Sequence, residues 1–177
     1  KRQGGLGALA TTWIWYGKPN LAQTLNGALA GLVSITAGCG NMTAVGAVVA
    51  GLIGGIIVVF SIEFIEKKLK IDDAIGAASV HGVVGVWGTL VIGLWGVDGD
   101  TAIGLFNGGG ASQLGFQAIG ALAYAAWSVG LSFIVLGILK ATMGLRVSKE
   151  VEIEGLDISE HGSIAYPGKR QRDFEEE

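Results

Sequence analysis

Long runs of uncharged, mostly apolar residues alternate with short polar segments along most of the chain. A helix of about 20 apolar residues is needed to cross a bilayer core about 30 Å thick. Residues 43–62 form an uncharged run of 20, residues 74–97 contain one His and no fixed charge, and residues 113–139 are 27 uncharged positions. Each of these three runs predicts a transmembrane helix.

Two further segments are apolar but less uniform. Residues 20–42 hold Gln and Asn near their ends around an uncharged interior, and they also predict a span. Residues 1–19 begin with two cations and end in aromatic residues, Lys and Pro, which leaves about 14 mostly apolar positions, too few for a full crossing. They lack the small-residue cleavage site of a signal peptide. We therefore expect this first helix to be the end of a longer span, and the chain to be part of a larger membrane protein.

The predicted fold is all-α, a polytopic bundle of transmembrane helices followed by a polar tail. The expected spans are residues 3–16 (incomplete), 21–39, 43–66, 74–97 and 113–143. Charge separates the bundle from the tail, because the first 143 residues carry 13 charged side chains and the last 34 carry 14. The sequence therefore predicts a transmembrane domain over 1–143 and a tail over 144–177.

The distribution of basic residues predicts how the bundle is oriented. Lys and Arg of short loops are enriched on the cytoplasmic side of membrane proteins. They flank the predicted spans at Lys18, in the loop 66–73, and at Lys140 and Arg146. The segments 38–42 and 98–112 contain neither residue and are expected outside. This alternation predicts a multi-pass protein of the cell membrane whose C-terminal tail is cytoplasmic.

Glycine is unusually frequent, with 31 residues of 177, more than twice the roughly 7% of ordinary proteins. The glycines show no collagen-like period and lie inside apolar runs, as is common in transmembrane helices. Gly27 and Gly31 form a GxxxG pair, and Ala47, Gly51 and Gly55 continue small residues at four-residue spacing. Such spacing predicts helices whose backbones approach closely.

Several classes of function are not supported. One Cys and two His are too few for a typical metal site, and we expect no metal and no other cofactor. The net charge of −3 without a basic cluster argues against a nucleic-acid partner. The chain also lacks a P-loop, an HExxH motif and a nucleophile elbow, so we do not expect an enzyme.

His81 is the most informative single residue, because it is the eighth position of the apolar run 74–97. Ionisable residues at such depth are costly and usually face a partner or a polar path, although a neutral His bonded to a carbonyl is the structural alternative. We favour the functional interpretation, with a neutral imidazole that donates from one nitrogen and accepts at the other. Helical spacing makes Ala77, Val84 and Gly85 its expected neighbours on a substrate path.

Asp72 and Asp73 precede this helix. Aspartates at a helix start cap free N–H groups and complement the helix dipole. Pairing with the lysines of the loop 67–70 is a second structural interpretation, and a role at the cytoplasmic mouth of a path is the functional one. We favour a structural role.

Three segments together resemble one family. They are LNGALAGLVSITAGCG at 25–40, KKLKIDDAIGAASVHGVVGVWGTL at 67–90, and GLRVSKEVEIEGLDISEHGSIAY at 144–166. In this order they resemble the ammonium transporter (Amt/MEP, related to Rh) family, and the resemblance extends from about residue 11 to 166. It implies an eleven-span protomer with an outside N-terminus, an inside C-terminus and a homotrimer with one pore per subunit. The chain then corresponds to the last five spans, the first of them truncated.

The resemblance also implies a mechanism. His81 matches the second of two pore histidines that pass ammonium-derived species through a hydrophobic pore, while the first histidine and the aromatic gate match nothing here. The implied function is transport of ammonium or ammonia, with the lipid bilayer as surroundings. An ammonium sensor that signals through its tail is the alternative. One departure is that four uncharged residues, 74–77, separate the aspartates from the region of His81, where many members keep another polar residue.

The tail resembles the cytoplasmic regulatory region of the family. Ser159 falls where some relatives carry a phosphorylatable Thr, and a phosphate there would lie beside Asp157 and Glu160. A Ser that caps a turn is the structural alternative, and His161 is expected to be a tail contact. Some bacterial and archaeal relatives are blocked by PII-type signal proteins at this face, which makes such a partner plausible here. The last eleven residues are expected to be disordered.

Overall fold

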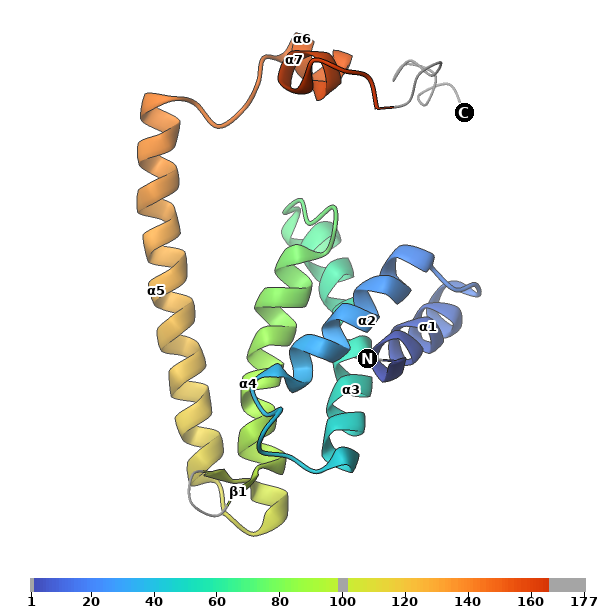
Figure 1. The fold of residues 1–177 in the computed structure, drawn as a ribbon, viewed down its shortest axis with the longest axis vertical. Coiled ribbons are helices and arrows are strands. Elements are labelled where there is room, and N and C mark those ends of the chain that lie inside the picture. Colours follow the sequence, from blue (N-terminus) through green and yellow to red (C-terminus); the bar gives the residue numbers. More distant parts are fainter. Residues whose placement is uncertain (1, 99–101, 166–177) are drawn as a thin grey trace. The chain divides into compact units, whose positions relative to one another are not determined.

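The computed structural model of the chain describes residues 2–98 and 102–165, and nearly all of its elements are helical (Figure 1). The elements, in chain order, are α1 (Arg2–Tyr16), α2 (Leu21–Thr36), α3 (Ala44–Glu63), η1 (Phe64–Leu69), η2 (Ala78–Val83), α4 (Val84–Trp95), β1 (Val97–Asp98), β2 (Ala102–Ile103), η3 (Leu105–Asn107), α5 (Ser112–Thr142), α6 (Lys149–Glu154) and α7 (Leu156–His161). The elements η1 and η2 are π-helical and η3 is a 3₁₀ turn. The strands are two residues each and pair antiparallel.

The chain divides into two compact parts, residues 1–125 and 126–177, which we describe separately. In the first part α1, α2 and α3 pack against one another, and η2 with α4 packs against α2 and α3. The core consists of small and β-branched side chains, which are Ala8, Ala30, Val58, Val59, Ile62, Val80 and Val84. Small side chains let these helices approach closely, as the glycine pattern predicts.

Glycines make the closest helix contacts. A Cβ atom built on Gly55 of α3 would lie 2.0 Å from the carbonyl oxygen of Gly4 in α1. A Cβ on Gly27 of α2 would lie 2.3 Å from the Cβ of Ala8, and one on Gly4 would lie 2.7 Å from the Cα of Gly31. No side chain fits at these crossings. The close packing predicted for the GxxxG pair and for Gly55 is confirmed.

Three helical segments in the described residues are long and apolar enough to cross a membrane. They are Ala44–Leu69, Ala78–Trp95 and Ser112–Thr142, whereas Leu21–Thr36 is apolar but shorter. The fourth predicted span differs most, because helix begins near Ala78 instead of at residue 74. Gly76 has a left-handed backbone (φ +72°), which delays the start of the helix.

Loops that the charge pattern predicts on one side of the membrane lie at one end of the first part. Met42 and Gly96 form an isolated antiparallel bridge, and the N–H of Val97 donates to the side-chain oxygen of Asn41 at 2.9 Å. This joins the turn 38–42 to the segment after α4. At the opposite end, Tyr16 at the end of α1 bonds to Glu63 at the end of α3. The grouping of loops agrees with the charge pattern, and the orientation relative to the cytoplasm stays a prediction.

The second part contains the end of α5 and the tail helices. Ser148 caps α6 by accepting from the N–H of Val151 at 3.4 Å, and Arg146 forms an ion pair with Glu152. Gly162, with φ +66°, ends α7 in the left-handed conformation that glycine favours. The disorder expected for the last eleven residues falls outside the described part of the chain.

Candidate functional site

His81 lies on η2, and its side chain is exposed. Ala77, one turn earlier, is also exposed, and Gly85, one turn later, is half-buried. Two residues of the same turn, Ser79 and Val80, are buried in the bundle. The turn therefore has a buried side and an exposed side, and His81 is on the exposed one.

Val84 does not share the environment of His81, although helical spacing predicted that it would. It is fully buried and belongs to the core, in a cluster that includes Val58 and Val80. The physical reason is the π-helical winding, in which the N–H of Val84 donates to the carbonyl of Ser79 five residues earlier. Such a turn holds more residues than the 3.6 of an α-helix, so the side chains that follow it are rotated. Residues 81 and 84, which are three positions apart, therefore do not share a helix face across this turn.

Asp73 closes the start of η2. Its carboxylate accepts hydrogen bonds from the N–H of Ala78 at 2.8 Å, from the N–H of Ser79 at 3.0 Å, and from the hydroxyl of Ser79 at 2.8 Å. The residue is only 6% exposed. Two N–H groups at the helix start, which would otherwise lack partners, are thus satisfied.

The hydrogen bonds determine the ionisation of Asp73. Burial raises the pKa of this carboxyl, but the backbone and hydroxyl donors of Ala78 and Ser79 outweigh it and hold the pKa below its ordinary value. A carboxyl whose folded-state pKa is lowered stabilises the fold above its ordinary pKa. That contribution is lost as the pH falls through the lowered value. Asp73 is therefore ionised and stabilising at neutral pH.

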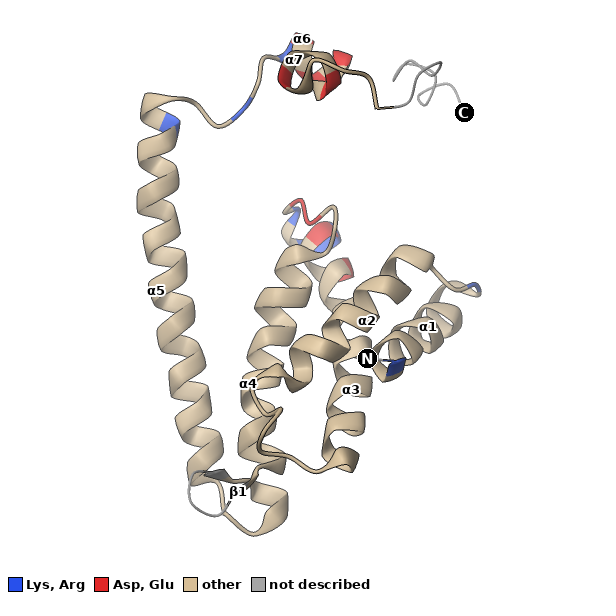
Figure 2. Ribbon diagram, in the orientation of Figure 1, with Lys and Arg blue, Asp and Glu red and all other residues tan. Residues whose placement is uncertain are grey.

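The ion pair near Asp73 differs from the possible pairing of Asp72 and Asp73 with the lysines of the loop 67–70. Asp72 is exposed, and Lys67 forms its ion pair with Glu63, four residues earlier on the same helix. Figure 2 shows acidic and basic residues gathered around the connection between α3 and α4. The capping interpretation thus describes the geometry of Asp73, and the ion-pair interpretation does not.

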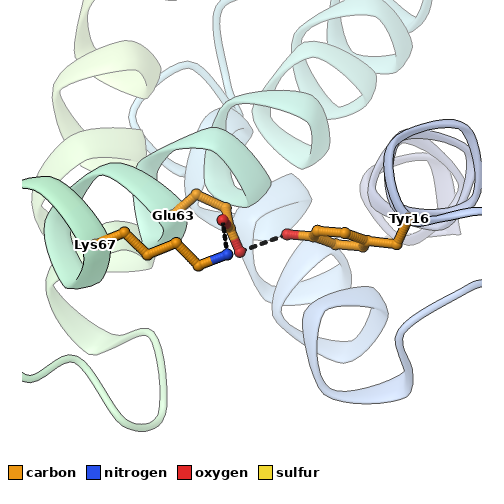
Figure 3. A network of polar contacts seen from close by, with 3 residues as sticks. All are labelled: Tyr16, Glu63 and Lys67. Carbon is orange, nitrogen blue, oxygen red and sulfur yellow. Dashed lines mark hydrogen bonds and ion pairs between the residues drawn. The ribbon is translucent and has the colours of Figure 1, made fainter.

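A polar network joins α1 to α3 at this end of the bundle (Figure 3). The hydroxyl of Tyr16 donates to Oε1 of Glu63, and the ammonium group of Lys67 contacts Oε2 of the same carboxylate. The i,i+4 spacing of Glu63 and Lys67 is visible in the sequence. No local pattern indicates Tyr16, which is 47 residues away.

Replacement of Tyr16 by Phe is expected to lower the thermal stability of the detergent-solubilised protein. It removes a hydrogen bond to a carboxylate, worth about 1.5 kcal/mol at the lower end for charged partners. Partial exposure reduces this to about 1 kcal/mol, or about 2–4 °C in melting temperature for a domain of this size. Tyr124→Phe is the matched control, because Tyr124 is 77% exposed. Equal melting temperatures for the two variants would show that the Tyr16 hydroxyl contributes nothing.

The residues predicted for regulation lie in the tail helices. Ser159 is exposed on α7, and its hydroxyl donates to the carbonyl of Leu156 at 3.5 Å. Asp157 accepts from the N–H of Ala165 at 2.9 Å, and His161 is exposed in the last turn of α7. Within the described residues, His, Cys, Asp and Glu form no group of three that could hold a metal ion.

The described helices include three that are long and apolar enough to cross a membrane, and glycines make the closest contacts between helices. One apolar helix carries His81 on a π-helical turn. These features are those of a polytopic membrane protein. The family model described as the Ammonium Transporter Family matches residues 2–166. The chain belongs to this family, whose members are channel-like transporters of the multi-pass membrane type and not enzymes.

Similar curated proteins and solved structures agree with this assignment. Ammonium transporter Amt2 of Archaeoglobus fulgidus is 41% identical over 175 residues, which cover 93% of this chain and 36% of that protein. Ammonium transporter Amt1 of Haloferax mediterranei is 39% identical over 93% of this chain and 30% of its own length. The chain thus spans about a third of the length of these relatives.

Among solved structures, a sensor Amt protein superimposes with a TM-score of 0.82 at 38% identity, covering 90% of this chain and 39% of its own. Mep2 of Saccharomyces cerevisiae superimposes with a TM-score of 0.75 at 30% identity, covering 84% and 35%. The predicted family and the predicted all-helical fold are both confirmed.

Proposed function

We propose that this protein moves ammonium or ammonia across a membrane, and that His81 lines the path. The observation that carries the proposal is an exposed imidazole within an apolar, membrane-length segment of a chain in the ammonium transporter family. Ala77 and Gly85 flank His81 and offer little bulk, so they are the proposed neighbours on the path. Val84 is assigned to packing because its side chain is fully buried.

The chemistry of the segment favours a neutral transported species. An ammonium ion that leaves water for an apolar path loses its hydration, which costs several kcal/mol even after relaxation. A neutral imidazole offers one acceptor and one donor without adding a fixed charge. The path would therefore carry ammonia past His81, with the proton moving separately.

The proposal extends to assembly and regulation. We propose a homotrimer in the cell membrane with a cytoplasmic tail, supported by the family resemblance and by the distribution of Lys and Arg. A phosphate on the exposed Ser159 would add a charge of about −1.5 to −2 beside Asp157 and Glu160 and would repel them. The tail, including His161, would then control access, and a PII-type signal protein is the proposed partner at this face.

A sensor is the second candidate, because one of the similar solved structures is a sensor Amt protein, which superimposes with a TM-score of 0.82. A sensor would bind ammonium in the same bundle and pass the signal to its tail. Binding is common to both candidates, so only movement across the membrane separates them.

Uptake of labelled methylammonium by cells that lack their own ammonium transporters tests the proposal. The full-length protein is expected to give saturable uptake that unlabelled ammonium competes away, while cells with an empty vector show neither. Binding of ammonium to the purified protein is measured in parallel. Saturable binding without uptake would exclude transport and support the sensor.

A further inference from the structure

The start of the His81 helix is held by a single buried side chain. The carboxylate of Asp73 accepts three hydrogen bonds from Ala78 and Ser79, which are the first two residues of η2. Ser79 is itself fully buried. A buried carboxylate with all its partners in one turn constrains that turn strongly, since loss of the acceptor leaves buried donors unsatisfied.

This turn has a winding that an isolated helix does not favour. π-helical turns are rare and often occur at functional positions. In a regular α-helix, positions 81 and 84 would share a face. In the structure Val84 is in the core and His81 is exposed. The winding between Ser79 and Val84 thus separates the imidazole from the core.

From these two observations we infer that Asp73 is a positioning residue for His81. Its carboxylate binds the N–H of Ala78 and both the N–H and the hydroxyl of Ser79. These bonds hold Ser79 and Val80 toward the core. The π-helical winding then places His81 on the exposed side. Asp73 does not touch the substrate and acts through this turn. The positioning role rests on the proposed function, because the orientation of His81 matters only if His81 lines the path. The constraint that Asp73 places on the turn does not depend on the proposed function.

The rest of the surroundings do not supply an alternative anchor. Gly76 packs against the side chain of Asn26, where an added Cβ would lie 2.5 Å from Nδ2, and its left-handed φ permits the chain to reverse. The carbonyl of Gly76 accepts from the N–H of Val80 at 2.8 Å. These contacts shape the loop, but the first two N–H groups of η2 are bonded to Asp73.

Hydrogen exchange of the full-length protein tests the constraint directly. Asp73→Asn keeps the size of the side chain but replaces one acceptor oxygen with a donor group. Peptides covering residues 74–86 are expected to exchange about tenfold to a hundredfold faster, as follows from loss of hydrogen bonds to a charged group. Peptides from α2 are expected to be unchanged. Glu66→Gln, a matched change at an exposed carboxylate, is expected to alter neither.

Uptake kinetics of the same variants test the positioning role. Asp73→Asn is expected to lower the maximal uptake rate per folded protein by about tenfold, corresponding to about 1.4 kcal/mol, with a smaller change in the half-saturating concentration. A purely structural cap would reduce the amount of folded protein and leave the rate per folded protein intact. Glu66→Gln is expected to keep the wild-type rate.

Ser79→Ala is the second variant, and it serves if Asp73→Asn fails to fold. It removes one of the three bonds, so its exchange and its rate are expected to fall between those of the wild type and Asp73→Asn. Unchanged exchange at 74–86 in both variants would overturn the constraint. Faster exchange with an unchanged rate per folded protein would overturn the positioning role. Absence of uptake by the wild type would overturn the proposed function alone, because the exchange result stands without transport.

Discussion

Replacement of His81 by Ala in the full-length protein is expected to lower methylammonium uptake about tenfold or to relax its selectivity against other small cations, with little change in melting temperature. His81 lies outside the core of the described bundle, so its removal leaves the packing of these helices intact. Its loss removes a hydrogen bond of about 1–1.5 kcal/mol from a solute that finds no replacement in an apolar segment, and about 1.4 kcal/mol corresponds to tenfold.

The measurement compares uptake per unit of membrane-inserted protein for the wild type, His81→Ala and a control. Ile75→Ala is suited as the control, because Ile75 is 78% exposed and lies outside η2. Its uptake is expected to match the wild type. Wild-type rate and selectivity in His81→Ala would remove the imidazole from the mechanism. A large fall in melting temperature would assign it to the fold.

The positions of the helices follow from local rules, and the sequence predicts them well. Uncharged runs of 20 residues or more leave little choice in a bilayer, because every backbone polar group must be satisfied within the segment. The small residues at four-residue spacing likewise predict the glycine crossings, since the backbone approach depends on the absence of a Cβ. The family was predicted from three continuous segments of the sequence, 25–40, 67–90 and 144–166.

The environment of the candidate site is less predictable, because it depends on one departure from regular winding. The rule that residues three or four apart share a face predicts Val84 beside His81, whereas the structure places Val84 in the core and His81 on the exposed side of η2. The rule assumes 3.6 residues per turn, and no local pattern in the sequence marks the π-helical turn. Asp73 could be predicted as a cap, but its bond to the Ser79 hydroxyl depends on the tertiary burial of both residues.

Long-range polar pairs are not predictable from spacing either. The Glu63–Lys67 pair follows a known helical spacing, whereas the bond from Tyr16 to Glu63 depends on how α1 crosses α3. That crossing is itself set by glycines of both helices. The same contacts that bring the helices together therefore create the network at their end.

Gly55→Ala is expected to destabilise the bundle strongly. The added Cβ would lie 2.0 Å from the carbonyl oxygen and 2.9 Å from the Cα of Gly4. Both atoms are backbone, so no side-chain rotation relieves the overlap, and α1 must move away from α3. Overpacking of a core costs about 1–3 kcal/mol where side chains can adjust. We expect about 3 kcal/mol or more here, with a fall in melting temperature of about 6–12 °C.

Gly120→Ala provides a control of opposite sign. Gly120 lies within α5, and no atom of the described residues comes within 4 Å of an added Cβ, so the same substitution meets no obstacle among them. Ala is favoured over Gly in a helix by up to about 1 kcal/mol, so the melting temperature is expected to stay equal or rise. Melting of the two purified variants in the same detergent separates packing from helix propensity. A melting temperature of Gly55→Ala equal to or higher than that of Gly120→Ala would show that the α1–α3 contact tolerates a side chain. The glycines would then be a feature of composition and not the means by which these helices approach.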